Sequence, residues 1–198
     1  MEDISPNRIK VSIIGDSGVG KTSLAQKEIY GTFDYAVTPT IGTSHLIAHE
    51  KVDNVDVEMC LWDTAGQEKY KSLVPLYTRD SDVIIIVASI ADHLSVQNVS
   101  KWVEMILESN GDPQFLVAIN KMDMPIDNSD AILDPLQNEY DDLFLVSAKT
   151  GDGVRELFFK AAKMGYTRQT SPPKEKDNQH QVITKNKQKS KSKDSDCC

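Results

Sequence analysis

The segment at residues 15–22, GDSGVGKT, fits the phosphate-loop pattern G-x-x-x-x-G-K-S/T without a mismatch. Its small residues let the backbone wrap around a phosphate with N–H groups pointing inward, and the helix that follows adds a favourable dipole. Lys21 would contact the β- and γ-phosphates, and Thr22 would offer a hydroxyl to Mg²⁺. A glycine-rich turn that binds nothing is the alternative, and the loop alone does not distinguish ATP from GTP. The predicted phosphate-binding residues here are Ser17, Gly18, Val19, Gly20, Lys21, Thr22 and Ser23.

A second polar group, from Asp63 to Gln67, follows a predicted strand. An acidic residue at such a strand end can hold Mg²⁺, usually through water, and we assign this role to Asp63. Gly66 allows the backbone to approach the terminal phosphate, and the Gln67 amide can orient an attacking water, which makes Gln67 the candidate catalytic residue. Taken singly, Asp63 could be a strand-end cap and Gln67 an exposed loop residue. The joint pattern favours the metal and hydrolysis roles.

The run Asn120, Lys121, Met122 and Asp123 comes directly after another predicted strand, at the edge where such sheets bind ligands. The Asp123 carboxylate can accept hydrogen bonds from the ring N–H and the amino group of guanine. Adenine offers no matching pair and would leave the carboxylate partly unpaired, at a cost of about 1–3 kcal/mol. Asn120 can bridge strands and loop, and the Lys121 stem can lie on the base. A polar turn after a strand is the alternative interpretation.

A tripeptide after the last predicted strand lies at the same edge and consists of Ser147, Ala148 and Lys149. The backbone N–H of Ala148 could meet the guanine carbonyl oxygen. By itself this tripeptide is weak evidence. Together with the phosphate loop and residues 120–123, it predicts a guanine-nucleotide site.

Short apolar runs alternate with amphipathic stretches along the chain. Strands are predicted at residues 11–14, 43–49, 55–62, 83–88, 115–119 and 143–146, the second and third forming a hairpin across a polar turn at residues 51–54. Helices are predicted at residues 21–30, 94–110, 129–140 and 154–164, although Pro135 lies inside the third. This alternation is typical of an α/β fold with a six-stranded, mostly parallel sheet and helices on both faces.

Charge is divided unevenly along the chain. The formal net charge is −8, but residues 167–198 carry eight basic and four acidic residues, a net of +4, which leaves −12 for residues 1–166. The acidic body argues against binding to nucleic acid, whereas the basic end can be drawn to an anionic membrane surface. Residues 167–198 are too polar to bury a core, so we predict a domain at residues 1–166 followed by a disordered tail.

Cysteine use indicates a reducing, intracellular setting, because Cys60, Cys197 and Cys198 are odd in number and lack the spacing of a disulfide framework. The first residues hold no apolar run of the signal-peptide type. The longest apolar run, residues 83–88, is too short to span a bilayer. Any membrane attachment is therefore expected to be covalent or peripheral.

With these motifs in this order, the chain resembles a Ras-superfamily small GTPase, and most of all the Rab branch. The resemblance covers about residues 9–164 and the final two residues. Residues 62–68, WDTAGQE, match the family's second switch, and residues 38–42, TPTIG, match its first. The resemblance implies a Ras-like P-loop GTPase fold, with Thr40 as a second hydroxyl on Mg²⁺ that is engaged only when the γ-phosphate is present. It also implies that Phe33 packs edge-on against the guanine.

Some residues depart from the Rab pattern. Residues 43–45, TSH, stand where Rabs usually have V-D-F, and Ala88 and Ser89 replace a usual Y-D pair. The family's effector-reading aromatic triad would be His45, Trp62 and Tyr77, so one of three members is not apolar, and Trp62 and Tyr77 could equally be half-buried packing residues. Residues 72–81 are similar to Rabs of Golgi traffic. The departures affect the identity of the partners and leave nucleotide binding intact.

Cys197 and Cys198 end the chain after a basic segment, without a C-a-a-X box. This end resembles that of doubly geranylgeranylated Rabs, and two lipid chains anchor stably where one is marginal. The lysines at every second position from Lys185 to Lys193 would add attraction to anionic lipid. The resemblance implies a monomeric GTP/GDP switch of vesicular traffic that hydrolyses GTP slowly. It would cycle between the cytosol and the cytoplasmic face of Golgi or endosomal membranes, with Rab-type effectors, exchange factor, activating protein and dissociation inhibitor.

Two other classes remain as alternatives. A P-loop kinase or ATPase would prefer adenine and carry a lid domain, which the residues at 120–123 and the Cys-Cys end argue against. A pseudo-GTPase that only binds a partner would not need Lys21, Thr22, Thr40, Asp63 and Gln67, all of which are present.

Overall fold

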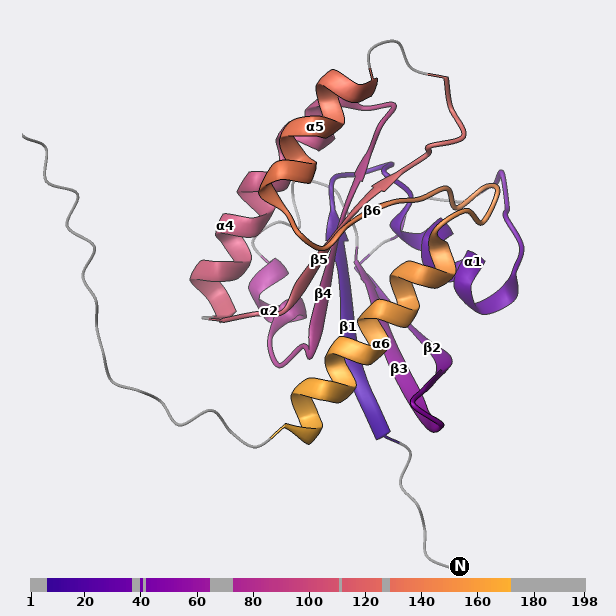
Figure 1. The fold of residues 1–198 in the computed structure, drawn as a ribbon, viewed down its shortest axis with the longest axis vertical. Coiled ribbons are helices and arrows are strands. Elements are labelled where there is room, and N and C mark those ends of the chain that lie inside the picture. The colour runs from indigo at the N-terminus through magenta and orange to yellow at the C-terminus, as the bar shows by residue number, and fades with distance from the viewer. Residues whose placement is uncertain are drawn as a thin grey trace, which may run out of the picture.

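The computed structural model describes residues 7–36, 40, 42–64, 73–110, 112–125 and 129–171. A six-stranded sheet forms its centre, with strand order β2-β3-β1-β4-β5-β6 (Figure 1). The β2–β3 pair is antiparallel and every other neighbouring pair is parallel. The predicted α/β architecture is therefore confirmed.

The strands run where the apolar runs predicted them, with ends that differ by a few residues. Within β4 every residue is buried, as expected for a parallel strand covered on both faces. In β1, Val11 and Ile13 face one core and Ile14 faces the other. The strands are β1 Asn7–Gly15, β2 Thr43–Val52, β3 Val55–Thr64, β4 Val83–Ser89, β5 Phe115–Asn120 and β6 Leu143–Leu145.

Helices cover both faces of the sheet and close two separate hydrophobic cores (Figure 1). On one face lie α1 (Lys21–Tyr30) and α6 (Val154–Thr170), the latter burying Leu157 and Phe158. On the other face lie α2 (Val74–Thr78), α3 (His93–Gln97), α4 (Val99–Asn110) and α5 (Ser129–Glu139). Among the described helices, none is both long and apolar enough to cross a membrane.

The β2–β3 hairpin turns more tightly than predicted. The turn consists of Asp53 and Asn54, with φ of 49° and 66°, while Val52 pairs with Val55. Two left-handed residues in a two-residue loop are typical of the type I′ turn, whose twist matches that of the flanking strands. The predicted turn at residues 51–54 was two residues too long, because Lys51 and Val52 still pair with β3.

The predicted single helix at residues 94–110 is wrong, since α3 and α4 are separated at Asn98. Asp92 begins α3 by accepting hydrogen bonds from the backbone N–H groups of Leu94 and Ser95. The Asn98 side chain is bonded to Asp16 of the phosphate loop, a tertiary contact that helical periodicity does not reveal. Helix α2 was not predicted, and α6 extends six residues beyond the predicted end at residue 164.

Helix α5 forms as predicted despite Pro135. Proline removes the bond to the carbonyl four residues earlier, here Ala131. Both residues are exposed, so water can replace the lost partner, and Leu133 and Leu136 still pack into the core.

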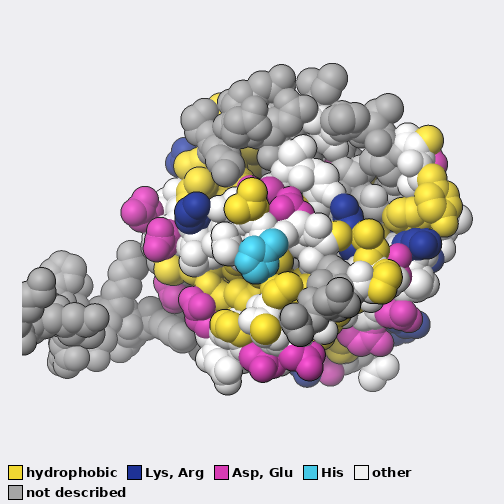
Figure 2. All heavy atoms as spheres, turned by 90° about the horizontal axis from the view of Figure 1, so that it is seen from above, with side chains coloured by type: hydrophobic (Ala, Val, Ile, Leu, Met, Phe, Trp, Pro, Cys, Tyr) yellow, Lys and Arg dark blue, Asp and Glu magenta, His cyan; other side chains and the backbone are white. Residues whose placement is uncertain are grey.

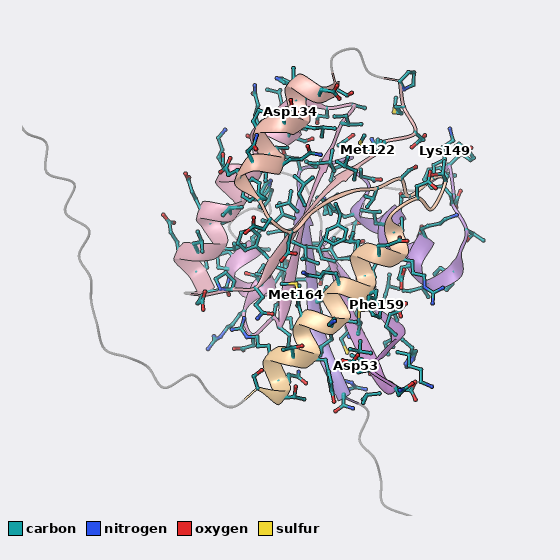
Figure 3. The ribbon with its side chains drawn as sticks, viewed as in Figure 1. Asp53, Met122, Asp134, Lys149, Phe159 and Met164 are labelled. Atoms are coloured by element: carbon teal, nitrogen blue, oxygen red, sulfur yellow. The ribbon has the colours of Figure 1, made fainter. Side chains whose placement is uncertain are left out.

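The site end and the hairpin end of the sheet are far apart. Figure 3 shows Met122 and Lys149 at the upper end, where the parallel strands finish, and Asp53 at the lower end in the hairpin turn. Figure 2 views the molecule from above, and acidic side chains line the lower rim of this view. Because the parallel strands finish at the upper end in Figure 1, that end is the ligand edge expected for such a sheet.

One acidic side chain on the face of the sheet that α1 and α6 cover has a raised pKa. Glu28 of α1 is half-buried, and this burial, reinforced by the charge of Glu50 on β2 and opposed by Arg155 on α6, raises the pKa of the Glu28 carboxyl from 4.5 to about 7. The folded protein therefore binds this proton more tightly than the unfolded chain does. Its contribution makes folding less favourable as pH rises from about 4.5 to about 7.

We predict that Glu28→Gln raises the free energy of unfolding at pH 8 by about 1 kcal/mol, a figure reduced for the partial exposure of the group. The gain should shrink strongly towards pH 4.5, where the parent carboxyl is protonated in the folded state and half protonated in the unfolded chain. Urea unfolding at both pH values measures this, with the exposed Glu108→Gln as the matched control. Equal gains at the two pH values would contradict the prediction.

Candidate functional site

The phosphate loop begins where β1 meets β4. Gly15 pairs with Val87, and a Cβ atom at Gly15 would collide with the Val87 carbonyl oxygen. Gly20, with φ of 99°, is equally constrained, because a Cβ there would collide with the Asn120 amide. The two glycines of the sequence pattern are therefore positions where backbone and neighbours approach too closely for a side chain.

Lys21 lies in the first turn of α1 and is 5% exposed. Its Nζ donates to the backbone oxygens of Gly15, at 3.0 Å, and Asp16, at 2.7 Å. Burial lowers the pKa of Lys21 to about 8, although Asp63 and Asp16 favour its charged form. A phosphate in this loop would supply the negative charge that the buried ammonium lacks.

Three hydroxyls converge on the buried carboxylate of Asp63. Thr22 donates to Asp63 Oδ2 at 2.6 Å, and the hydroxyls of Thr40 and Ser44 lie 3.3 and 3.4 Å from the same oxygen. The Oγ1 atoms of Thr22 and Thr40 are 2.8 Å apart. Sequence analysis had not singled out Ser44.

The second carboxylate oxygen of Asp63 differs from the first in its hydrogen bonding. Its Oδ1 is buried without a hydrogen-bond partner among the described residues. Burial raises the pKa of the Asp63 carboxyl, while the hydrogen bonds from Thr22, Thr40 and Ser44 and the charge of Lys21 oppose the shift. A hard cation with its bound water would satisfy Oδ1, and hydroxyl and carboxylate oxygens are ligands that Mg²⁺ accepts. The residues present therefore fit the predicted Mg²⁺ site of Thr22, Thr40 and Asp63.

The Asn120 amide connects the phosphate loop to the base loops, which are the loops after β5 and β6 that hold the predicted guanine-binding residues. It is 1% exposed; its Nδ2 donates to the Val19 carbonyl at 2.8 Å, and its Oδ1 accepts from the backbone N–H of Ala148 at 3.0 Å. Lys121 donates to the Gly18 carbonyl at 2.8 Å. Because the Ala148 N–H is engaged by Asn120 here, its bond to a guanine carbonyl stays a prediction.

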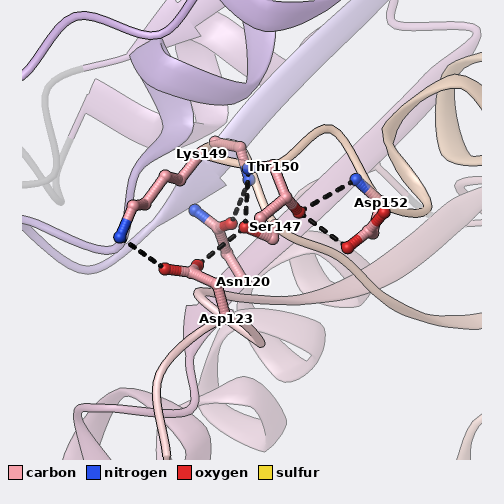
Figure 4. Close-up of polar contacts among 7 residues, drawn as sticks. Asn120, Asp123, Ser147, Lys149, Thr150 and Asp152 are labelled. Atoms are coloured by element: carbon pink, nitrogen blue, oxygen red, sulfur yellow. Dashed lines mark hydrogen bonds and ion pairs between the residues drawn. The ribbon is translucent and has the colours of Figure 1, made fainter.

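Asp123 is oriented by two neighbours (Figure 4). Ser147 donates to its Oδ1 at 2.7 Å, and Lys149 Nζ lies 3.5 Å from its Oδ2. The hydrogen bond from Ser147 lowers the pKa of the Asp123 carboxyl below its usual range, which keeps it ionised and able to accept bonds from a base.

Two residues that sequence analysis missed support this arrangement (Figure 4). Thr150 donates its backbone N–H to Ser147 Oγ at 3.2 Å and its hydroxyl to Asp152 at 2.7 Å. They hold the loop that carries Ser147. Closely spaced Thr and Asp residues before Gly153 are a turn signal that could have indicated such a support.

One cavity of about 530 Å³ joins the phosphate loop to the base loops, a size typical of small-molecule sites. Phe33 lines it and packs edge-on against Tyr35, with ring centroids 5.0 Å apart. The predicted site residues that line the cavity are Ser17, Gly18, Gly20, Lys21, Thr22, Ser23, Phe33, Thr40, Asn120, Lys121, Asp123, Ala148 and Lys149.

Other predicted residues lie behind the cavity or elsewhere. Val19 and Ser147 are buried and act through their neighbours. Gly66 and Gln67 of the second switch, and the terminal Cys197 and Cys198, lie outside the described residues, so their predicted roles stay predictions.

A comparison with protein families gives a match between the Ras family and residues 10–166. The chain belongs to the Ras family. Ras-family proteins are small GTPases that bind GTP and GDP, typically with Mg²⁺, and that meet regulators and effectors. The predicted superfamily and the Ras-like fold are thereby confirmed. The assignment of the cavity between Lys21 and Asp123 to a guanine nucleotide stays a prediction.

We predict that Gly20→Ala weakens GDP binding roughly 100-fold, because the new methyl group would displace the Asn120 amide and strain the left-handed backbone. The matched control is Gly31→Ala at the end of α1, where φ is 67° and the space is open. Gly31→Ala should lower stability by about 1 kcal/mol and keep GDP affinity. Equilibrium titration with GDP measures both variants, and equal losses would contradict the steric explanation.

Proposed function

We propose that this protein is a Rab-type GTP/GDP switch of vesicular membrane traffic that hydrolyses GTP slowly to GDP and phosphate. The observation that carries the proposal is the position of Thr40. This residue belongs to the first switch, yet its hydroxyl lies 2.8 Å from that of Thr22 in the phosphate loop and 3.3 Å from Asp63. A segment that contacts the site of the terminal phosphate can report whether that phosphate is present.

The residues of the chain have distinct tasks in this mechanism. Lys21 exchanges its carbonyl partners for the β- and γ-phosphates of GTP. Thr22, Thr40 and Asp63 would hold Mg²⁺, which neutralises phosphate charge when bound. Gln67 orients the attacking water, and loss of the γ-phosphate frees Thr40. Intrinsic turnover in this class is slow, on the order of 10⁻⁴ s⁻¹ for Ras, and an activating protein raises it.

The proposed partner surface lies beside the first switch. His45 of β2 packs edge-on against Trp62 of β3, with ring centroids 5.6 Å apart, and Lys10 Nζ lies 4.9 Å from the centre of the Trp62 ring. His45 is exposed, and Trp62 and Tyr77 are half-buried. An aromatic surface with polar margins is the kind that protein partners use. It supports binding of Rab-type effectors, with a specificity altered by the histidine.

Localisation forms part of the same proposal. Prenylation of Cys197 and Cys198 would anchor the protein to the cytoplasmic face of Golgi or endosomal membranes. An exchange factor, an activating protein and a dissociation inhibitor of Rab type would govern its cycle. The support for this step is the terminal Cys-Cys sequence and the lysines that precede it.

The test of the switch is nucleotide choice and hydrolysis. We predict that the parent binds GTP and GDP in preference to ATP, and that Asp123→Asn shifts preference towards xanthine nucleotide, because xanthine has a carbonyl where guanine has its amino group. Competition titration measures the shift. Single-turnover phosphate release should be slower in Gln67→Leu than in the parent, with GTP affinity retained. GTP affinity unchanged in Asp123→Asn, or unchanged release in Gln67→Leu, would refute the role assigned to that residue.

For the membrane anchor, we predict that replacing both Cys197 and Cys198 by Ser leaves the protein in the soluble fraction of cells, with GDP binding intact. A single replacement should give partial attachment, because one lipid chain is near the threshold for stable anchoring. Fractionation measures this, and Cys60→Ser is the matched control. If the double variant sediments with membranes as the parent does, these cysteines do not hold the protein there.

A further inference from the structure

Asp16, the second residue of the phosphate loop, connects the loop to α4. Its Oδ2 accepts a hydrogen bond from Asn98 Nδ2 at 2.7 Å, and its Oδ1 accepts one from the indole Nε1 of Trp102 at 3.2 Å. Asn98 immediately precedes α4, and Trp102 lies in its first turns, 4% exposed. Two donors more than eighty residues away in sequence thus hold one carboxylate of the loop.

The same residue also holds the phosphate-binding lysine. The backbone oxygen of Asp16 accepts a hydrogen bond from Lys21 Nζ at 2.7 Å. The position of the Lys21 ammonium therefore depends on where the Asp16 peptide lies. That peptide is fixed on one side by the pairing of Gly15 with Val87 and on the other by the bonds from Asn98 and Trp102.

Lys101 orients the Asn98 amide. Its Nζ donates to Asn98 Oδ1 at 2.9 Å, so the amide presents its Nδ2 to the carboxylate. The amide lies between a cation and an anion with its dipole aligned to both, and hydrogen bonds to charged groups are stronger than neutral ones. Without these donors the Asp16 carboxylate could turn towards the phosphates and repel them.

We propose that Asn98 and Trp102 are positioning residues for the phosphate loop, which hold it through Asp16 and thereby slow nucleotide release. The inference rests on the proposed function, since it requires that the loop retains GDP. It assigns to α4, which does not line the cavity, a direct part in nucleotide retention. The competing explanation is that the bonds merely attach α4 to the domain.

A second attachment of α4 separates these explanations. Asn110 at the other end of the helix donates to the Thr78 hydroxyl at 3.1 Å. Asn110→Ala therefore removes a hydrogen bond that an Asn amide of α4 donates, here to a neutral hydroxyl, without touching the phosphate loop. Asn98→Ala removes a donor to Asp16 without opening the core, and Trp102→Phe removes the indole N–H and keeps an aromatic ring in the core.

The experiment measures release of a fluorescent GDP analogue from the full-length protein, with excess unlabelled GDP and Mg²⁺, and the ³¹P spectrum of bound GDP. Asn98→Ala and Trp102→Phe should each release GDP about 3- to 10-fold faster than the parent, because only part of the free energy of the lost hydrogen bond acts on the release step. Both should shift the β-phosphate resonance. Asn110→Ala should match the parent in both readouts, even if its melting temperature falls.

Asp16→Ala tests whether the donors act through this carboxylate. The double variant with Asp16→Ala and Asn98→Ala should release GDP no faster than Asp16→Ala alone. Parental release and spectrum in Asn98→Ala, an equal effect in Asn110→Ala, or additive effects in the double variant would each overturn the inference. If the parent itself fails to retain GDP, the proposed function fails as well, whereas retention by the parent with no effect of Asn98→Ala overturns the positioning role alone.

Discussion

The buried amide of Asn120 is the constraint on which the two halves of the site depend. It donates to Val19 in the phosphate loop and accepts from Ala148 in the loop after β6, so the predicted phosphate-binding and base-binding loops share one side chain. Its removal would leave a buried carbonyl and a buried N–H unpaired, at about 1–3 kcal/mol each. Gly20 leaves room for this amide, because a Cβ atom at Gly20 would collide with it. The distance between the two ends of the cavity is therefore set by a covalently rigid group at the end of β5.

Two buried charged groups suit the predicted site to a ligand of high charge. Lys21 and Asp63 are both removed from water. Burial lowers the pKa of Lys21, and Oδ1 of Asp63 has no hydrogen-bond partner in the part of the chain that the structure describes. The protein has already met the desolvation cost during folding, at the expense of stability elsewhere. A ligand that brings phosphate and a divalent cation relieves both groups at once, which is why the two lie together at the start of α1 and the end of β3.

Much of the architecture was predictable from periodicity, and the parts that were not depend on tertiary contacts. Helix α1 begins and ends where predicted, because a lysine follows the glycine-rich loop and Gly31 ends the helix. The break at Asn98 could not be read from the sequence, since the side chain there bonds to Asp16, far away along the chain. In the site, motif residues such as Lys21 and Asp123 could be named beforehand, because their spacing is tied to chemistry. Ser44 could not, because a hydroxyl that orients another side chain leaves no pattern of its own, and Thr150 was marked only by a turn signal that does not specify its contacts.

The tight turn at Asp53 and Asn54 fixes the register of β2 and β3 along their whole length. β3 pairs with β1 so that Asp63 lies opposite Ile13, and with β2 so that Ser44 lies opposite Asp63. A slip of the hairpin by one residue would turn Met59 and Leu61 outward and carry the carboxylate to the other face of the sheet. The two-residue loop leaves no slack to absorb such a slip. The position of Asp63, the predicted metal ligand near the end of the ten-residue strand β3, thus depends on the turn at the opposite end of that strand.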